Sequence, residues 1–411
     1  MSPSRTIDYV GAFYDQREID AVVDVLTTSL RVGAKVAELE AEVASLWGKR
    51  RSVMVNSGSS ALQLAYDVMD LPPDAEFITS AVTFSTTVAP GIRNGLVPVV
   101  VDVDLDTYQI DVDAIESAVS ERTRAIVVPN LAGNCPDWDR IRTIADAHDL
   151  LVVEDSADTM GATLRGTPTG LRSDISITSF AMSHIITAAG NGGMVMVDRD
   201  DWWDRALLRR RWGRSSEPRF FGSRQEERGR FVAEVDGLDY DALFVFEELG
   251  HNFEPSEIGA AFALVQLERM PGFLERRRAN VAAHTACFAR WPEVFRTPVE
   301  TPDLVTSWLQ YPVQIEEGAP FDRADFQTHM KAFGISTRMV WSGNVTRQPM
   351  WEGVRHRVGP GGLDRADRIM ERGVLLPCHQ TMDDDDLAYV HDAVQDLMDH
   401  GPRAARLKQW R

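Results

Sequence analysis

Seven short apolar runs, rich in β-branched residues, alternate with longer stretches of helical periodicity in the first half of the chain. The runs are 52–56, 77–80, 97–102, 125–129, 150–155, 175–179 and 194–197. Continuous apolar strands separated by helices are typical of a mostly parallel sheet that helices cover on both faces. We therefore expect an α/β fold in which ligands bind at the carboxyl ends of the strands.

The rest of the chain predicts a second, smaller unit. Segment 205–234 is rich in arginine and acidic residues, contains no clear strand, and is expected to leave the sheet. Helical periodicity returns at about 256–288, long enough to bridge two domains. A strand (308–315), a helix (322–333), a strand (336–340) and a last helix (384–400) are expected after it. We predict a large domain over 1–265 and a small C-terminal α/β domain over 266–411.

Composition argues against several classes of partner. The formal net charge is −19 and no stripe of Lys or Arg interrupts it, which disfavours nucleic acid and anionic membranes. No apolar run is long enough to span a membrane, and the N-terminus lacks the apolar core of a signal peptide, so we expect a cytoplasmic protein. Cys135, Cys287 and Cys378 share no CxxC spacing and predict neither disulfides nor a metal site.

Polar or aromatic residues follow three of the predicted strands. In NSGSS (56–60), free backbone N–H groups at a helix start would bind a phosphate, although an ordinary serine N-cap gives this pattern more often. Asp155 ends an apolar strand, and a buried carboxylate there needs a partner such as a protonated ring nitrogen, or else caps a helix. Phe84 would stack on a flat ring or simply belong to the core.

Taken together, five motifs resemble the sugar aminotransferases of the DegT type, which are fold-type I enzymes that use pyridoxal phosphate. The motifs are NSGSSAL (56–62), AVTFSTTV (81–88), VVEDSADTMGA (152–162), SFAMSH (179–184) followed by GNGG (190–193), and LGHNFEPSEIGAAFALVQLE (249–268). The resemblance implies a phosphate held by Gly58, Ser59 and Ser179. It further implies a ring under Phe84 whose nitrogen pairs with Asp155.

The same resemblance implies a homodimer with an active site shared between the subunits. Asn252 of one subunit would reach the phosphate bound by the other. Glu254 stands where relatives carry Arg or Lys, which leaves the identity of the sugar carrier open.

Two departures from the aminotransferase pattern narrow the expected function. His184 occupies the position of the lysine that attaches the cofactor covalently, and no lysine occurs between residues 50 and 330. Asp158 stands where aminotransferases usually carry glutamine. Both replacements resemble the 3-dehydratases of nucleotide-linked 4-keto-6-deoxyhexoses, which make 3-deoxysugars, although Ile185 stands where those enzymes have a second histidine.

Two further segments are similar to this subgroup. Segment 336–354, STRMVWSGNVTRQPMWEGV, implies that Arg338, Asn344 and Arg347 lie near the sugar or its nucleotide. Segment 210–232, RRWGRSSEPRFFGSRQEERGRFV, corresponds to the region that carries an iron–sulfur cluster in one branch, and it contains no cysteine. The resemblance therefore implies a one-component enzyme with neither a cluster nor an electron-transfer partner.

The expected reaction follows from the missing lysine. Pyridoxamine phosphate would be held without a covalent bond, and His184 would move a proton between the cofactor and the departing C3 hydroxyl of the sugar. L-Glutamate would regenerate the amine form. Three alternatives stay open: transamination without dehydration, action on another keto-sugar conjugate such as a nucleoside sugar in antibiotic biosynthesis, and a non-catalytic relative with a packed His184.

Overall fold

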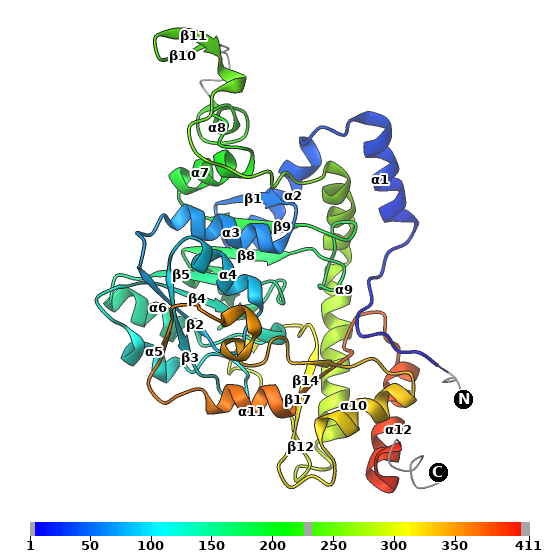
Figure 1. Cartoon of the computed structure of the whole chain (residues 1–411). Coiled ribbons are helices and arrows are strands. Elements are labelled where there is room, and N and C mark those ends of the chain that lie inside the picture. Colours follow the sequence, from blue (N-terminus) through cyan, green and yellow to red (C-terminus); the bar gives the residue numbers. More distant parts are fainter. Residues whose placement is uncertain (1–4, 226–231, 404–411) are drawn as a thin grey trace.

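An eight-stranded sheet forms the centre of the larger part of the molecule (Figure 1). The computed structural model describes residues 5–225 and 232–403. The strands are, in spatial order, β1 (Arg51–Val55), β9 (Gly193–Val197), β8 (Ile175–Ser179), β5 (Leu151–Asp155), β4 (Thr123–Pro129), β2 (Glu76–Ser80), β3 (Val97–Val101) and β16 (Arg357–Val358). Seven of these strands run in the same direction and β9 alone runs in the opposite one, so the predicted mostly parallel α/β sheet is confirmed.

Helices cover both faces of this sheet because its strands are apolar on both sides. One face packs against α3 (Gly58–Met69), α4 (Ser85–Arg93) and α7 (Asp200–Arg210), and the other against α2 (Ala34–Leu46), α5 (Val112–Ala118) and α6 (Trp138–Ala147). In β1, Val53 and Val55 pack on the face covered by α3, α4 and α7, whereas Met54 packs on the face covered by α2. This alternation follows the two-residue period of a strand.

The C-terminal part contains its own sheet and core. A four-stranded sheet runs in the order β12 (Phe295–Arg296), β14 (Tyr311–Ile315), β17 (Gly373–Leu376) and β15 (Arg338–Met339). It packs with α10 (Arg323–Ala332), α12 (Asp384–His400) and the last turns of α9, and α11 (Asp364–Arg372) leads into β17. Ile7, near the N-terminus, packs in this C-terminal core, and β16, from the C-terminal half, pairs with the large sheet. The two parts therefore do not correspond to two continuous stretches of sequence. The domain boundary at 265/266 stays a prediction.

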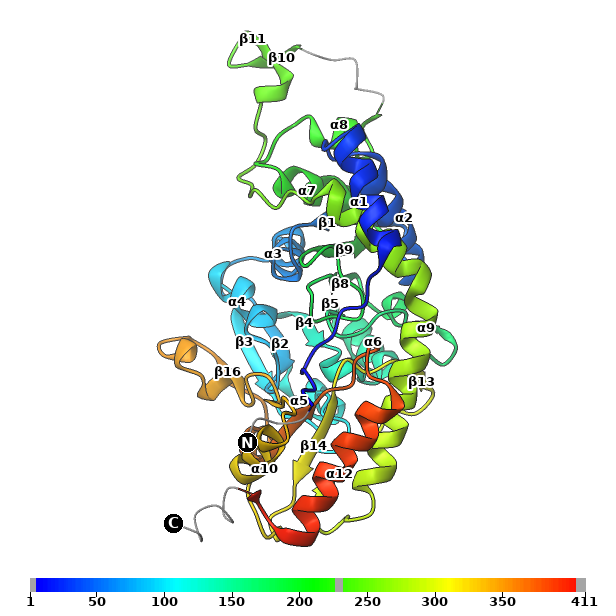
Figure 2. The same cartoon turned by 90° about the vertical axis from the view of Figure 1, so that its right-hand side faces the viewer.

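A single helix, α9 (Glu257–Phe288), links the two parts (Figure 2). Its start is fixed by Ser256, whose side chain accepts a hydrogen bond from the backbone N–H of Gly259. The first half packs against α1 (Gln16–Thr28) and α2, and the last turns enter the C-terminal core. The predicted bridging helix at about 256–288 is therefore present.

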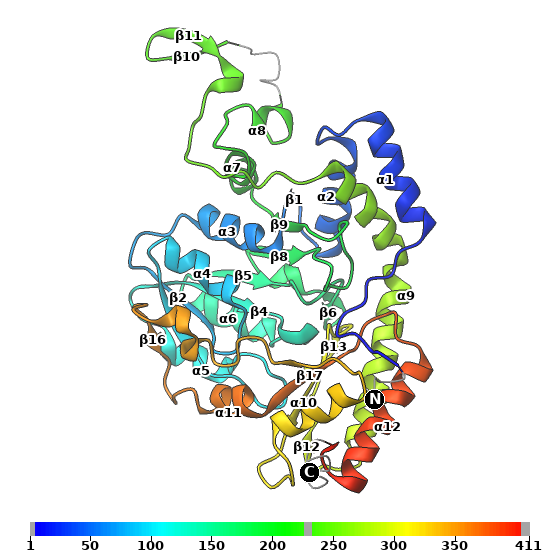
Figure 3. The same ribbon diagram turned by 45° about the vertical axis from the view of Figure 1, so that its right-hand side comes forward.

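The arginine-rich segment leaves the sheet as expected and forms an arm. After α7 the chain continues into α8 (Glu217–Phe220) and then the hairpin of β10 (Val232–Val235) and β11 (Leu238–Asp241), far from the C-terminal part (Figure 3). The expectation of no strand in 205–234 is wrong, because β10 begins at Val232, inside that segment, and pairs with β11. Residues 226–231 of the segment lie outside the described residues. Short strands β6 (Thr163–Leu164), β7 (Thr167–Pro168) and β13 (Leu304–Val305) form a separate ladder. None of the helices described has the length and apolar character needed to cross a bilayer.

Candidate active site

A cavity of about 850 Å³ lies at the carboxyl ends of β1, β2, β5 and β8, where the C-terminal part faces the large sheet. Eight of the eleven predicted site residues line it: Gly58, Ser59, Phe84, Asp155, Asp158, Ser179, His184 and Arg338. They come from loops far apart in sequence. The structure thus brings together the residues that follow separate strands, as expected for a parallel sheet.

One end of the cavity is built to hold an anion. Ser57 caps α3 by accepting a hydrogen bond from the N–H of Ser60 at 3.1 Å, which leaves the first N–H groups of the helix for a ligand. Position 58 must be glycine because the chain passes close to Ser179: a Cβ on residue 58 would lie 2.7 Å from Cβ of Ser179. Ser59 is exposed beside it. These residues therefore fit a phosphate group.

A buried carboxyl group without a cation lies next to this end. Asp155 is 4% exposed, and its oxygens accept hydrogen bonds from Thr87 Oγ1 at 2.7 Å and from the N–H of Ala157 at 3.2 Å. Burial raises its pKa to about 6, and the bond from Thr87 offsets only part of this shift. Within the described chain no Lys, Arg or His pairs with it, so a protonated ring nitrogen would supply the missing charge. Phe84, 53% exposed, lines the same cavity and offers a face for that ring.

His184 lies in the turn after β8 with one ring nitrogen unused. Its Nδ1 is buried, makes no hydrogen bond to any described residue, and lies 3.8 Å from Oδ1 of Asp158. Burial, helped by the charge of Arg277, lowers the pKa of His184 to about 4. Burial, followed by the charge of Asp155, raises the pKa of Asp158 well above its ordinary value. The imidazole is therefore neutral near pH 7 and able to accept a proton.

No lysine lines this cavity. Lys49 donates to the carbonyl of Ser173 and pairs with Asp198 at 3.0 Å, far from the cavity-lining loops. Of the other lysines, Lys35 pairs with Glu38 on the surface, Lys331 belongs to α10, and Lys408 lies outside the described residues. Within the described part of the chain, no lysine amine near His184 takes over covalent attachment.

Two predicted substrate residues do not reach the cavity. Arg347 donates to both oxygens of Asp367 at 3.0 and 2.7 Å, and Asn344 donates to the same carboxylate at 2.7 Å. Both side chains are paired with Asp367 here, and their place near the sugar or its nucleotide stays a prediction. Their segment instead supports the loop of Phe84, since the N–H of Val345 donates to the carbonyl of Ala81 at 2.9 Å.

Asn252 is exposed and lies outside the cavity of its own chain. Its backbone bridges to Arg211, whose guanidinium pairs with Glu254 at 3.1 Å. The contribution of Asn252 to a second subunit stays a prediction.

Two lining residues carry no sequence signal that would have identified them. Tyr9 enters the cavity from the N-terminal segment, which is held by a 3.0 Å hydrogen bond between Nε2 of His379 and the carbonyl of Asp8. The guanidinium of Arg338 lies over the ring of Tyr9, 5.1 Å from its centre. Gln310 is the second such residue and lies just before β14.

Arg277 is a third residue that sequence reasoning missed. It is 1% exposed and donates to the carbonyls of Trp308 at 3.2 Å and Leu309 at 2.8 Å. Its Nε donates to Gln380, whose amide donates in turn to the carbonyl of Ile185, next to His184. Arg277 lies on the buried side of α9 with Phe273, Asn280 and His284. The helical spacing of these residues could have identified it as buried from the sequence.

The family model of the DegT/DnrJ/EryC1/StrS aminotransferase family matches residues 13–395, so the chain belongs to this family. Its sequence is 34% identical to dTDP-4-dehydro-2,6-dideoxy-D-glucose 3-dehydratase of Saccharopolyspora spinosa, over 94% of this chain and 86% of that protein. The structure is similar to GDP-4-keto-6-deoxymannose-3-dehydratase with bound GDP-perosamine, with a TM-score of 0.85 and 25% identity, covering 94% of this chain and 99% of that one. It is also similar to the same enzyme with a trapped PLP-glutamate geminal diamine, with a TM-score of 0.84 and 26% identity over 94% and 100% of the chains. The resemblance to the aminotransferase fold and to its 3-dehydratases is confirmed.

Proposed function

We propose that the protein is a pyridoxamine phosphate-dependent 3-dehydratase that removes the C3 hydroxyl of a nucleotide-linked 4-keto-6-deoxyhexose. L-Glutamate is the amino donor that restores the cofactor. The observation that carries the proposal is His184: a largely buried imidazole with a lowered pKa, whose Nδ1 lies 3.8 Å from Asp158, in a cofactor cavity that no lysine of the described residues lines. The names of the relatives, which are 3-dehydratases of nucleotide-linked keto-sugars, support the substrate class.

The cavity residues fit the phosphate, the ring and the ring nitrogen of the cofactor. When bound, pyridoxamine phosphate supplies an amine that condenses with the C4 ketone and a ring that accepts an electron pair. The start of α3, with Ser59 and Ser179, holds the phosphate, and Phe84 lies against the ring. Asp155 keeps the ring nitrogen protonated.

His184 performs the proton transfer in this proposal. It accepts a proton at the cofactor carbon attached to the amine and donates one to the C3 hydroxyl, which leaves as water. Asp158, 3.8 Å away, orients the ring and is itself held by the N–H of Ala132 at 3.2 Å. Because the cofactor itself supplies the two electrons that the sugar gains, the reaction requires no external reductant.

The donor set of the chain does not fit an iron–sulfur cluster. Such clusters are held by four ligands, usually cysteine thiolates, and the chain has three cysteines. All three are buried: Cys135 packs beneath the large sheet, and Cys287 and Cys378 lie in the C-terminal core. We therefore propose a one-component enzyme.

Mass spectrometry of the products tests the proposal. The protein is loaded with pyridoxamine phosphate and incubated with L-glutamate and a panel of 4-keto-6-deoxyhexoses linked to GDP, dTDP, UDP or CDP. We expect a sugar with one oxygen fewer, together with ammonia. The H184N variant should lose about 10²- to 10⁴-fold in rate, and H184K should no longer dehydrate. An aminated sugar as sole product, or an unimpaired H184N, would contradict the proposal.

We also propose that the active enzyme is a homodimer to which Asn252 of the partner subunit contributes. The exposed position of Asn252 and the apolar side chains on the arm support this, since Leu238 and Tyr240 of the hairpin are 67% and 53% exposed. Sedimentation and native mass spectrometry should show a dimer. The N252A variant should remain dimeric and bind the cofactor more weakly; a fully active monomer would refute this part.

A further inference from the structure

Gln310 is a buried polar residue of the cavity with an unused hydrogen-bonding group. It lines the cavity, is 4% exposed, and its Oε1 is buried without a hydrogen-bond partner among the described residues. Nearly all buried polar atoms in native proteins are paired, so each exception requires an explanation. Because this one lines the proposed substrate cavity, a bound molecule is the natural partner.

The backbone that carries Gln310 is held in a conformation that few residues adopt. Trp308 has a φ of 42°, in the left-handed region that is unfavourable for a bulky side chain. Arg277 fixes the carbonyls of Trp308 and Leu309, and the N–H of Leu309 donates to the carbonyl of Ala132 at 2.7 Å. Strain held in this way clusters at functional sites. Gln310 is thus presented to the cavity by a preorganised segment.

The same segment is connected to the proton-transfer pair. Ala132 accepts from the backbone of Leu309 and donates from its own N–H to Asp158, which lies 3.8 Å from His184. Glycine at position 133 makes this contact possible, because a Cβ there would lie only 2.4 Å from Cα of Trp308. Gln310 and His184 therefore line the same cavity from segments that Ala132 and Asp158 connect, and we expect both to contact the sugar ring.

Two other polar side chains of the cavity, Gln348 and Arg338, are less suited to a sugar hydroxyl. Gln348, also a lining residue, donates to the carbonyl of Ser342 at 2.7 Å. Arg338 lies over the ring of Tyr9 and carries a charge, which suits a phosphate better than a sugar hydroxyl. The neutral carboxamide of Gln310 is suited to a hydroxyl, and its Oε1 is buried without a partner among the described residues.

We infer that Gln310 binds the C2 hydroxyl of the sugar and makes the enzyme selective for substrates that retain it. The inference rests on the proposed function. A 4-keto-6-deoxyhexose linked through C1 has hydroxyls only at C2 and C3, and the C3 hydroxyl is the one that leaves. The names of two relatives differ at this atom: one substrate is a 2,6-dideoxy sugar, and the other enzyme acts on a 6-deoxymannose.

Two matched substrates test the inference: dTDP-4-keto-6-deoxy-D-glucose and its 2-deoxy counterpart, with the pyridoxamine phosphate-loaded enzyme. The wild type should prefer the substrate with the C2 hydroxyl by roughly fivefold to a hundredfold in kcat/KM, the range expected when a buried acceptor is left unpaired. In Q310M this ratio should fall to within about twofold of unity. Because the amide has no partner among the described residues, the thermal stability of Q310M should be unchanged or higher.

Gln109 provides a matched control for Gln310. It is 2% exposed, and its carboxamide bonds to both the N–H and the carbonyl of Leu131, at 3.2 and 3.1 Å. The Q109M variant should therefore lose stability, while it keeps the preference for the C2 hydroxyl.

The possible results separate this inference from the proposed function. If the wild type dehydrates both substrates equally, or if Q310M slows both by the same factor, the inference is wrong and the dehydratase activity still stands. If the wild type dehydrates neither these sugars nor any of the panel above, the proposed function itself fails, and the inference fails with it.

Discussion

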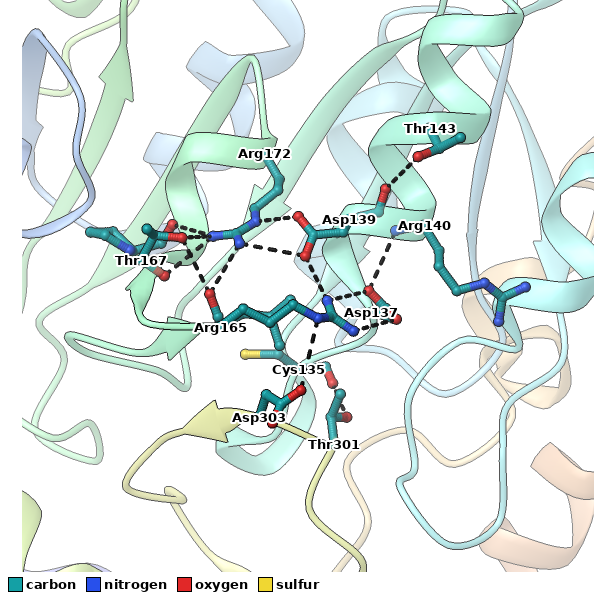
Figure 4. A network of polar contacts seen from close by, with 12 residues as sticks. Cys135, Asp137, Asp139, Arg140, Thr143, Arg165, Thr167, Arg172, Thr301 and Asp303 are labelled. Carbon is teal, nitrogen blue, oxygen red and sulfur yellow. Dashed lines mark hydrogen bonds and ion pairs between the residues drawn. The ribbon is translucent and has the colours of Figure 1, made fainter.

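Two pairs of acidic residues in the large part of the molecule have opposite electrostatic surroundings. Asp137 and Asp139 lie in a network in which Arg165 donates to both oxygens of Asp137 at 3.0 Å and Arg172 donates to Asp139 at 2.7 Å (Figure 4). Asp155 and Asp158 line the cavity, and among the residues described neither forms an ion pair with an arginine or a lysine.

The pKa shifts of the two pairs follow this difference. Hydrogen bonds from the arginines lower the pKa of Asp139 and outweigh the effect of burial on the pKa of Asp137. Burial raises the pKa of Asp155 and Asp158. Arginines thus balance the charge of the first pair, whereas at Asp155 a bound ligand would supply the cation.

The largest expected contrast is in the pH dependence of stability. The pKa of Asp155 is about 6 in the folded protein and 3.8 for an ordinary aspartate, so the folded state binds its proton more tightly. This contribution stabilises the cofactor-free protein below about pH 4 and is lost as the pH rises to 6, by about 3 kcal/mol. Urea unfolding of the wild type and D155N across this range measures it. Equal pH slopes for the two proteins would show that Asp155 is not desolvated.

The second-largest effect is expected in cofactor affinity, when Asp155 is replaced. D155N removes the charged acceptor of the ring nitrogen, which is worth about 1.5–3 kcal/mol, or a tenfold to hundredfold loss of pyridoxamine phosphate affinity. Titration followed by absorbance gives the Kd. D139N is the matched control, because it removes a carboxylate that no ligand contacts and should leave the Kd unchanged.

Breaking the arginine network should lower the free energy of unfolding without changing cofactor affinity. Arg172 is largely buried and donates to Asp139, to Thr167 and to the carbonyls of Leu164 and Pro168. We expect R172Q to lower the free energy of unfolding by about 2 kcal/mol, because these acceptors lose their donor. Chemical denaturation measures the loss. A change in cofactor affinity would mean that the two regions are coupled.

The smallest effect concerns the aromatic face of the cavity. Phe84 is 53% exposed in the free protein, so F84L should hardly change its stability. Loss of ring stacking should weaken cofactor binding by about 1 kcal/mol, or about fivefold. The same absorbance titration detects this shift. Destabilisation instead of weaker binding would place Phe84 in the core.

The sequence predicted best what depends on continuous local patterns. All seven apolar runs are strands, because each is buried on both faces and enriched in β-branched residues. The prediction was weaker in the C-terminal part. Strand β17 was missed because it begins at Gly373, directly after α11, with no turn residues between them. The strand expected from residue 308 begins at Tyr311, because Trp308 adopts a positive φ.

The candidate site was predictable only where a motif marks it. Asp155 ends β5 and His184 follows β8, each in a recognisable motif, and the structure places both at the cavity. Tyr9 and Gln310 reach it through long-range packing that leaves no local signature. The resemblance implies that Arg347 lies near the sugar or its nucleotide; the structure pairs it with Asp367, a partner that no sequence spacing identifies.

A cavity without a lysine also determines how long the cofactor stays. In the proposed cycle each turnover ends with the aldehyde form of the cofactor, and no amine on the protein captures it. Its residence then depends only on non-covalent contacts, so its dissociation rate competes with the reaction that regenerates the amine. Such an enzyme exchanges cofactor with its surroundings. Its steady-state rate should therefore follow the concentration of free pyridoxamine phosphate and be lost on dialysis.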